Sequence, residues 1–384
     1  MILIPGVAVA QGHAPIQATP SASPVAEPAA AWTVDGVDVV GVEGSPVTMS
    51  PDGAMVAGIG PEHQLCVWDL PALDVTCEEP SERNINPGSI VWSPDGTAIA
   101  YTLDAFLRGD ESDLFMYELE TGVSTNLTDD GVEGSLFSSD DDAPMLVDVM
   151  PTWTHDGQSL LFVRSDFTTD DPDTDLMTIS REGGEPVLLE TVSDYPFAIF
   201  TRMHLLADGS LVYSLGPGNL DDPDTGIWLR TPDGDHRQVL AGDSSTDFPL
   251  PIVTDVHEGD GTVLVAAYSY PALAQLDLDA PLAFVLDLGT GDVMPLELDD
   301  PPRQIGPTIF SPDGATLFSV ALGGEGDALV ISHDGEREMV ELGEGGESGS
   351  RPVHLYGGIE WRGDGILFIP NAMVRDPYIV TLGA

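Results

Sequence analysis

Two short segments rich in aspartate are the first candidates for chemistry in this sequence. One spans 170–175 (DDPDTD) and the other spans 221–226 (DDPDTG). Carboxylate oxygens at alternate positions suit Ca²⁺, which takes about six to eight oxygen ligands. The alternative is an acidic turn that contacts only solvent. The candidate calcium ligands are Asp171, Asp173, Asp175, Asp222 and Asp224.

Acid–base chemistry would fall to a few histidines and one aspartate. Asp255 and His257 are two residues apart, so in an extended strand both point to the same face. They could form an acid/base pair or part of a metal site at the mouth of a channel. His204, on the innermost strand of another unit, is a further channel candidate. The alternative is a buried, hydrogen-bonded couple that only holds the structure together.

A third candidate is the acidic segment that runs from 129 to 142. It combines carboxylates with one large aromatic side chain, which suits contact with a partner, although a solvated loop is the alternative. The candidate binding residues are Asp129, Asp130, Phe137, Asp140, Asp141 and Asp142.

The chain has two cysteines, Cys66 and Cys77. If Pro71 and Ala72 form the turn of a hairpin, these cysteines are direct neighbours on the two strands. Cβ atoms of such neighbours are about 4.5–5.5 Å apart, within adjustment of disulfide distance. We expect a disulfide, with two buried free thiols as the alternative.

The charge of the chain excludes several partners. Its 384 residues include 65 acidic and 12 basic ones, all 12 arginine, for a formal net charge of −53. Nucleic-acid binding requires Lys and Arg against phosphates, and anionic membranes repel such a protein. A cationic partner, metal cations or a salty environment suits it better.

The first residues indicate export. Residues 1–10 (MILIPGVAVA) are apolar and end in an A-x-A pattern, as in the last part of a signal peptide. Residues 11–33 are rich in Ala, Pro and Ser and predict a disordered linker. No later stretch is apolar for long enough to span a membrane. We therefore expect a soluble monomer, extracellular or in the cell envelope.

The elements that position these residues follow from a repeat. Seven Asp-Gly pairs, each between two apolar runs, begin at Asp52, Asp95, Asp156, Asp208, Asp260, Asp313 and Asp364, at spacings of 43 to 61 residues. Proline, aspartate and glycine at these points favour a tight turn between two strands. The residue three positions before the Asp is large and apolar in six of the seven copies, which predicts packing between neighbouring sheets.

Each unit continues with a second pair of strands, so the repeat is a four-stranded antiparallel unit. Units of this kind predict an all-β, seven-bladed β-propeller over 34–384, with six or eight blades as alternatives. The last unit has three strands, near 353–361, 366–370 and 378–382. An additional strand at Val37–Val42 can complete it and close the ring.

The pattern W-S-P-D-G before an apolar strand resembles the TolB-like, WD40-like PD40 propeller repeat. The best copies lie at 92–101, 153–163 and 310–320. The resemblance implies the propeller fold and transfers no catalytic residue, since such repeats occur both in binding proteins and beside peptidase domains.

Two functions follow as hypotheses. In a propeller, the connections between second and third strands share one face with the connections between blades, and here they are long and acidic. The first hypothesis is an exported, non-catalytic scaffold that binds a protein or envelope component through this face. The alternative is a metal-assisted hydrolase or lyase with its site at the central channel. The sequence leaves enzymatic activity open and makes Ca²⁺ the one candidate cofactor.

Overall fold

The structure of the chain is a computed structural model. It describes residues 32–70, 72–79, 84–103, 112–131, 145–169, 172–196, 198, 203–216, 222–242, 250–259, 261–269, 283–296, 304–322, 328–342, 359–363, 365–370 and 377–383. Residues 31–384 form one compact unit. The expected signal peptide (1–10) and most of the expected linker (11–33) lie outside the described residues. No described helix is long and apolar enough to cross a membrane.

The described strands form seven sheets of four, which we number as blades. Blade 1 contains β2 (Ser45–Met49), β3 (Met55–Ile59), β4 (Leu65–Asp69) and β5 (Val75–Cys77). Blade 2 contains β6 (Val91–Trp92), β7 (Ala98–Thr102), β8 (Leu114–Glu118) and β9 (Val123–Asn126), preceded by a short 3₁₀ helix, η1 (Pro87–Ser89). Blade 3 contains β10 (Leu146–Trp153), β11 (Ser159–Asp166), β12 (Thr174–Ser180) and β13 (Val187–Ser193). Blade 4 contains β14 (His204–Leu205), β15 (Leu211–Leu215), β16 (Gly226–Arg230) and β17 (His236–Ala241).

The remaining blades follow the same plan. Blade 5 contains β18 (Pro251–Gly259), β19 (Thr262–Ser269), β20 (Ala283–Asp287) and β21 (Val293–Leu296). Blade 6 contains β22 (Gln304–Phe310), β23 (Thr316–Leu322), β24 (Ala328–His333) and β25 (Glu336–Glu341). Blade 7 contains β26 (Glu360–Arg362), β27 (Ile366–Ile369), β28 (Tyr378–Gly383) and β1 (Thr33–Val39).

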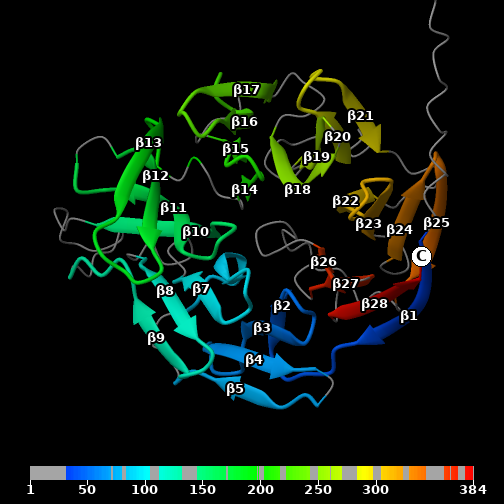
Figure 1. Cartoon of the computed structure of the whole chain (residues 1–384), viewed down its shortest axis with the longest axis horizontal. Coiled ribbons are helices and arrows are strands. Elements are labelled where there is room, and N and C mark those ends of the chain that lie inside the picture. Colours follow the sequence, from blue (N-terminus) through cyan, green and yellow to red (C-terminus); the bar gives the residue numbers. More distant parts are fainter. Residues whose placement is uncertain are drawn as a thin grey trace, which may run out of the picture. The chain divides into compact units, whose positions relative to one another are not determined.

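The blades stand around a ring, with the first strand of each innermost and the fourth at the periphery (Figure 1). This is the seven-bladed β-propeller that the repeat predicts.

Blade 7 closes the ring with strands from both ends of the described chain. β1 pairs antiparallel with β28, and Val34 lies opposite Leu382. The N-terminal closing strand is therefore confirmed, but its predicted bounds, Val37–Val42, were too late. β1 begins at Thr33 and ends at Val39, which lies opposite Tyr378, the first residue of β28.

The Asp-Gly turns owe their regularity to a local hydrogen-bond pattern. Ser50 Oγ donates to Asp52 Oδ1 at 2.6 Å, and the Ala54 amide donates to the same oxygen. The Met55 amide in turn donates to Ser50 Oγ. The serine hydroxyl, followed by the Ala54 amide, holds the pKa of Asp52 below its ordinary value. Gly53 takes a φ of 72°, which suits glycine. The hydroxyl-to-Asp bond recurs at Ser93–Asp95, Thr154–Asp156 and Ser311–Asp313.

Each of the seven seams between blades holds its own apolar cluster. At the seam of blades 2 and 3, Trp153, Leu160 and Phe162 pack against Leu114 and Met116. Such a side chain contributes on the order of 2 kcal/mol when it is buried. The expected packing position before each turn is confirmed for Met49, Trp92, Trp153, Leu205, Phe310 and Trp361.

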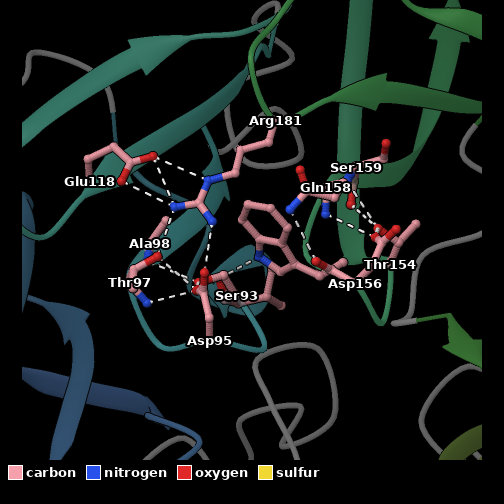
Figure 2. A network of polar contacts seen from close by, with 12 residues as sticks. Ser93, Asp95, Thr97, Ala98, Glu118, Thr154, Asp156, Gln158, Ser159 and Arg181 are labelled. Atoms are coloured by element: carbon pink, nitrogen blue, oxygen red, sulfur yellow. Dashed lines mark hydrogen bonds and ion pairs between the residues drawn. The ribbon is translucent and has the colours of Figure 1, made fainter.

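Arginines link neighbouring blades at their polar ends. Arg181, in the β12–β13 turn, donates to Glu118 at 3.1 Å and to Asp95 at 3.2 Å, both in blade 2, as Figure 2 shows. Its guanidinium also lies 5.7 Å from the centre of the Trp153 ring. Among the described residues, three further arginines donate across a seam, namely Arg230 to Glu190, Arg237 to the Leu288 carbonyl and Arg362 to the Met49 carbonyl.

The two cysteines lie opposite each other on β4 and β5, which is the register that the turn at Pro71 and Ala72 predicts. A disulfide joins them, with Cα atoms 4.1 Å apart. The next residue, Glu78, accepts hydrogen bonds from Tyr101 and Ser124 in blade 2. The disulfide therefore holds the short outer strand whose end contacts the next blade.

Candidate functional site

Carboxylates gather at one end of blades 2 and 3. In every blade the first and third strands begin, and the second and fourth strands end, at the same face, which we call the loop end. At the loop end of these two blades, the described residues include eight aspartates and one arginine, Arg164. The set that we name the acidic end consists of Asp113, Asp129, Asp130, Asp148, Asp166, Asp173, Asp175 and Asp194.

Arg164 and Asp148 form the buried centre of the acidic end. They are cross-strand neighbours on β10 and β11. Arg164 Nε and Nη2 each donate to one oxygen of Asp148, both at 2.7 Å. Asp148 is 1 % exposed, and burial raises the pKa of its carboxyl although the guanidinium opposes this. A bidentate pair of this kind is rigid, since the fork of the guanidinium matches the carboxylate.

Blade 2 meets this pair through its own buried carboxylate, Asp113. Asn126 Nδ2 donates to Asp113 Oδ2 at 2.6 Å, and Thr128 Oγ1 approaches Asp113 Oδ1 at 3.5 Å. The Asp148 amide donates to the Ser112 carbonyl at 2.7 Å, which joins the main chains of the two blades. Asp113 therefore contributes a negative charge next to Asp148.

Blade 3 adds four carboxylates that repel one another. Asp166 ends β11, Asp173 and Asp175 flank the start of β12, and Asp194 follows β13. Partial burial, followed by the charge of Asp175 and then those of Asp166 and Asp194, raises the pKa of Asp173. The blade thus presents concentrated negative charge at its loop end, which favours a cationic ligand.

The structure places part of the predicted binding segment at the acidic end. Asp129 and Asp130 follow β9, and Asp129 Oδ1 accepts from the Gly131 amide at 2.9 Å. Asp130 is close enough to Arg164 to favour its charged form. The other predicted residues of this segment, Phe137, Asp140, Asp141 and Asp142, lie outside the described residues.

The two predicted calcium segments differ in what their side chains do. Asp175 Oδ1 accepts from Thr191 at 2.6 Å, while Asp222 Oδ1 accepts from the Asp224 amide at 2.9 Å. Asp171 lies outside the described residues. Within the described part of the chain, no three or more His, Cys, Asp or Glu side chains are grouped as metal ligands. Calcium binding stays a prediction, which a rise in melting temperature with millimolar Ca²⁺ would support.

The predicted channel residues Asp255 and His257 both contact blade 6. Asp255 Oδ2 accepts from the Phe310 amide at 2.8 Å, and burial raises the pKa of Asp255 to about 6. The ring of His257 lies 5.7 Å from that of Phe310. Both contacts join blade 5 to blade 6, which corresponds to the structural alternative that the sequence left open for this pair rather than to acid/base or metal chemistry. His204 lies on β14, opposite Val212, in another blade.

Sequence reasoning missed the centre of the acidic end, Asp148 and Arg164, together with Asp113, Asp166 and Asp194. One signal was available. Asp148 interrupts the apolar run MLVDVM and Arg164 follows the run LLFV, so each is a charged residue in a strand that is otherwise buried. A charge in such a place requires a partner.

No family model matches the sequence, and no curated protein matches it. Among solved structures, an oligogalacturonate lyase in complex with manganese is 15 % identical, with a TM-score of 0.57 over 89 % of this chain and 90 % of its own. A second oligogalacturonate lyase, from Vibrio parahaemolyticus, is 13 % identical, with a TM-score of 0.56 over 88 % of this chain and 90 % of its own. At these identities the likeness shows the propeller fold alone.

TolB from Acinetobacter baumannii is 16 % identical over 75 % of this chain, with a TM-score of 0.44. The present chain spans 63 % of the length of that TolB chain.

Proposed function

We propose that the protein is a non-catalytic propeller that binds a cationic protein or envelope component through its acidic end. One observation carries the proposal. The acidic end brings eight aspartates and one arginine among the described residues to the same end of blades 2 and 3, and the guanidinium of that arginine is bonded to the buried Asp148. Four other arginines already donate to residues of a neighbouring blade at the seams. The remaining carboxylates attract a partner that supplies Lys or Arg, which raises the rate of encounter and favours such partners over others.

The test is capture from the envelope and secreted fractions of the source organism with matched baits. The test bait is Asp129→Asn/Asp173→Asn/Asp194→Asn. The control bait is Asp74→Asn/Asp233→Asn/Asp292→Asn, which changes exposed carboxylates at the opposite ends of other blades. Both baits lose the same three charges, so they separate location from net charge.

We expect one protein to bind the wild-type and control baits and to be lost from the test bait. Salt should weaken this binding, because exposed charges are screened. Equal loss from both baits would show that only net charge matters. If no protein is retained at low salt, the binding proposal is wrong.

The competing hypothesis is a metal-assisted lyase or hydrolase at the central channel. Its motive is the propeller fold that this chain shares with the oligogalacturonate lyases, a likeness that concerns the fold alone. The assay is incubation of the pure protein with oligogalacturonate and Mn²⁺, followed by detection of unsaturated products. Turnover that Asp255→Asn and His257→Ala both abolish, in folded protein, would replace the binding proposal.

Export is a further part of the proposal. The apolar residues 1–10, the Ala-x-Ala pattern and the Cys66–Cys77 disulfide all suit a secreted protein, since disulfides persist in oxidising compartments. N-terminal sequencing of the protein from the extracellular or envelope fraction should begin at Gln11. An unprocessed protein in the cytoplasmic fraction would contradict export.

A further inference from the structure

The outer strand of blade 3 exposes more apolar surface than any other described outer strand. Val187, Leu188 and Leu189 on β13 are 57 %, 53 % and 37 % exposed, and Tyr195 just after it is 51 % exposed. The outer strands of blades 1, 2, 5, 6 and 7 each expose one large apolar side chain, namely Val75, Val123, Met294, Met339 and Val39. Isolated apolar residues of this kind are ordinary, whereas a contiguous group marks an interaction site.

A β-bulge lies within the group. Leu188 lies opposite Met177 and Glu190 lies opposite Leu176, so Leu189 is the additional residue between them. A regular strand would direct alternate side chains to opposite faces, but a bulge interrupts this alternation. Bulges also hinder the addition of a further strand at a sheet edge. A partner would therefore contact the apolar side chains rather than the backbone of β13.

Negative charge borders this group at both ends. Glu182 and Glu185, in the turn before β13, are exposed, and so is Asp194, which belongs to the acidic end. Glu190, within the strand, is already bonded by Arg230 and His236 of blade 4. The nearby Arg181 is directed to Asp95 and Glu118 of blade 2 (Figure 2). The surface is thus apolar in its middle and anionic at its ends.

We propose that this surface, the apolar strip Val187, Leu188 and Leu189, docks a partner segment with apolar residues in its middle and Lys or Arg at its ends. The inference rests on the proposed function, because Asp194, at one of the two anionic ends of the strip, belongs to the acidic end. Charge complementarity selects this occupant. A second copy of this chain would bring Glu182, Glu185 and Asp194 against like charges, in a protein whose net charge is −53.

Two labelled synthetic peptides test the proposal by fluorescence anisotropy at physiological salt. Both carry Lys at their ends, and their middles are Leu-rich in one and Ser/Gly in the other. We expect the wild type to bind the Leu-rich peptide at least about tenfold more tightly, as burial of two leucines would give. Leu188→Ser/Leu189→Ser should abolish this preference. The control, Met294→Ser/Met339→Ser, removes two exposed apolar side chains elsewhere and should keep it.

Equal binding of the two peptides by the wild type, or equal effects of the two variants, would overturn the proposal. Circular dichroism checks that both variants are folded, as their exposed positions predict, and Leu188→Gln replaces the double variant if it is not. The same variants serve as baits in the capture experiment. One outcome separates the two proposals. If the bait Asp129→Asn/Asp173→Asn/Asp194→Asn loses the partner and the bait Leu188→Ser/Leu189→Ser retains it, the acidic binding function is supported and the apolar strip is refuted.

Discussion

Replacement of Arg164 by methionine should destabilise the propeller by leaving a carboxylate buried without its counter-ion. Asp148 is 1 % exposed and accepts both of its short bonds, at 2.7 Å, from this guanidinium. Loss of one partner of a buried ion pair costs about 3–5 kcal/mol. We expect about 4 kcal/mol, because the charge of Asp113 also acts on Asp148. For a domain of roughly 350 residues, this lowers the melting temperature by about 5 °C.

A second substitution separates charge from packing. In Asp148→Asn/Arg164→Met no charge remains at the centre of the acidic end, so the double variant should recover more than half of the loss. The coupling between the two positions is obtained from a double-mutant cycle with the two single variants. The measurement is urea unfolding followed by tryptophan fluorescence, with thermal melts as a second probe.

The pH dependence of Arg164→Met has a definite sign. Burial already raises the pKa of Asp148 in the wild type, and removal of the guanidinium raises it further. Between the ordinary value, near 4, and the raised one, the folded state binds more protons than the unfolded state. Stability of the variant relative to the wild type should therefore increase as the pH falls from 8 towards 5. If the deficit is constant over this range, or if the double variant is no more stable than Arg164→Met, the reasoning about a buried charge is wrong.

Three further predictions concern the seams and the disulfide. Arg181→Ala should cost about 1.5–2 kcal/mol in urea unfolding, from two partly exposed ion pairs of about 0.5 kcal/mol each and a cation–π contact with Trp153 of about 0.5–1 kcal/mol. Arg181→Lys should cost less than half of this. Cys77→Ser should cost about 3 kcal/mol, given a sequence separation of 11, and reductant should then have no additional effect on its melting temperature. Because the pKa of Asp255 is raised to about 6, wild-type stability should fall as the pH rises from 4 through 6. Asp255→Asn keeps an acceptor for the Phe310 amide but does not titrate, so it should flatten this dependence of stability on pH. Parallel melting profiles for the wild type and Asp255→Asn would contradict this assignment.

Much of the fold can be predicted because its signals are local. Proline, aspartate and glycine set the turn around Asp52, and the hydroxyl of Ser50 completes its hydrogen bonds within six residues of chain. The short hairpin around Ala72 likewise places Cys66 opposite Cys77. Only some residues of the acidic end could be predicted from the sequence. Asp129 and Asp173 were found as members of acidic runs, whereas Asp148 stands alone in an apolar strand.

The sequence by itself determined the four-stranded repeat, the number of blades and the cysteine pairing, since each depends on neighbours along the chain. Only the tertiary structure decided that Arg181 reaches Asp95, 86 residues away, and where along the chain β1 begins to pair with β28. It also decided that Asp255 bonds the Phe310 amide of blade 6. The physical reason is that a side chain's partner across a seam depends on how two twisted sheets pack and on where bulges interrupt their strands. A shift of one residue turns a side chain to the opposite face, and the hydrophobic pattern of one strand does not carry that information.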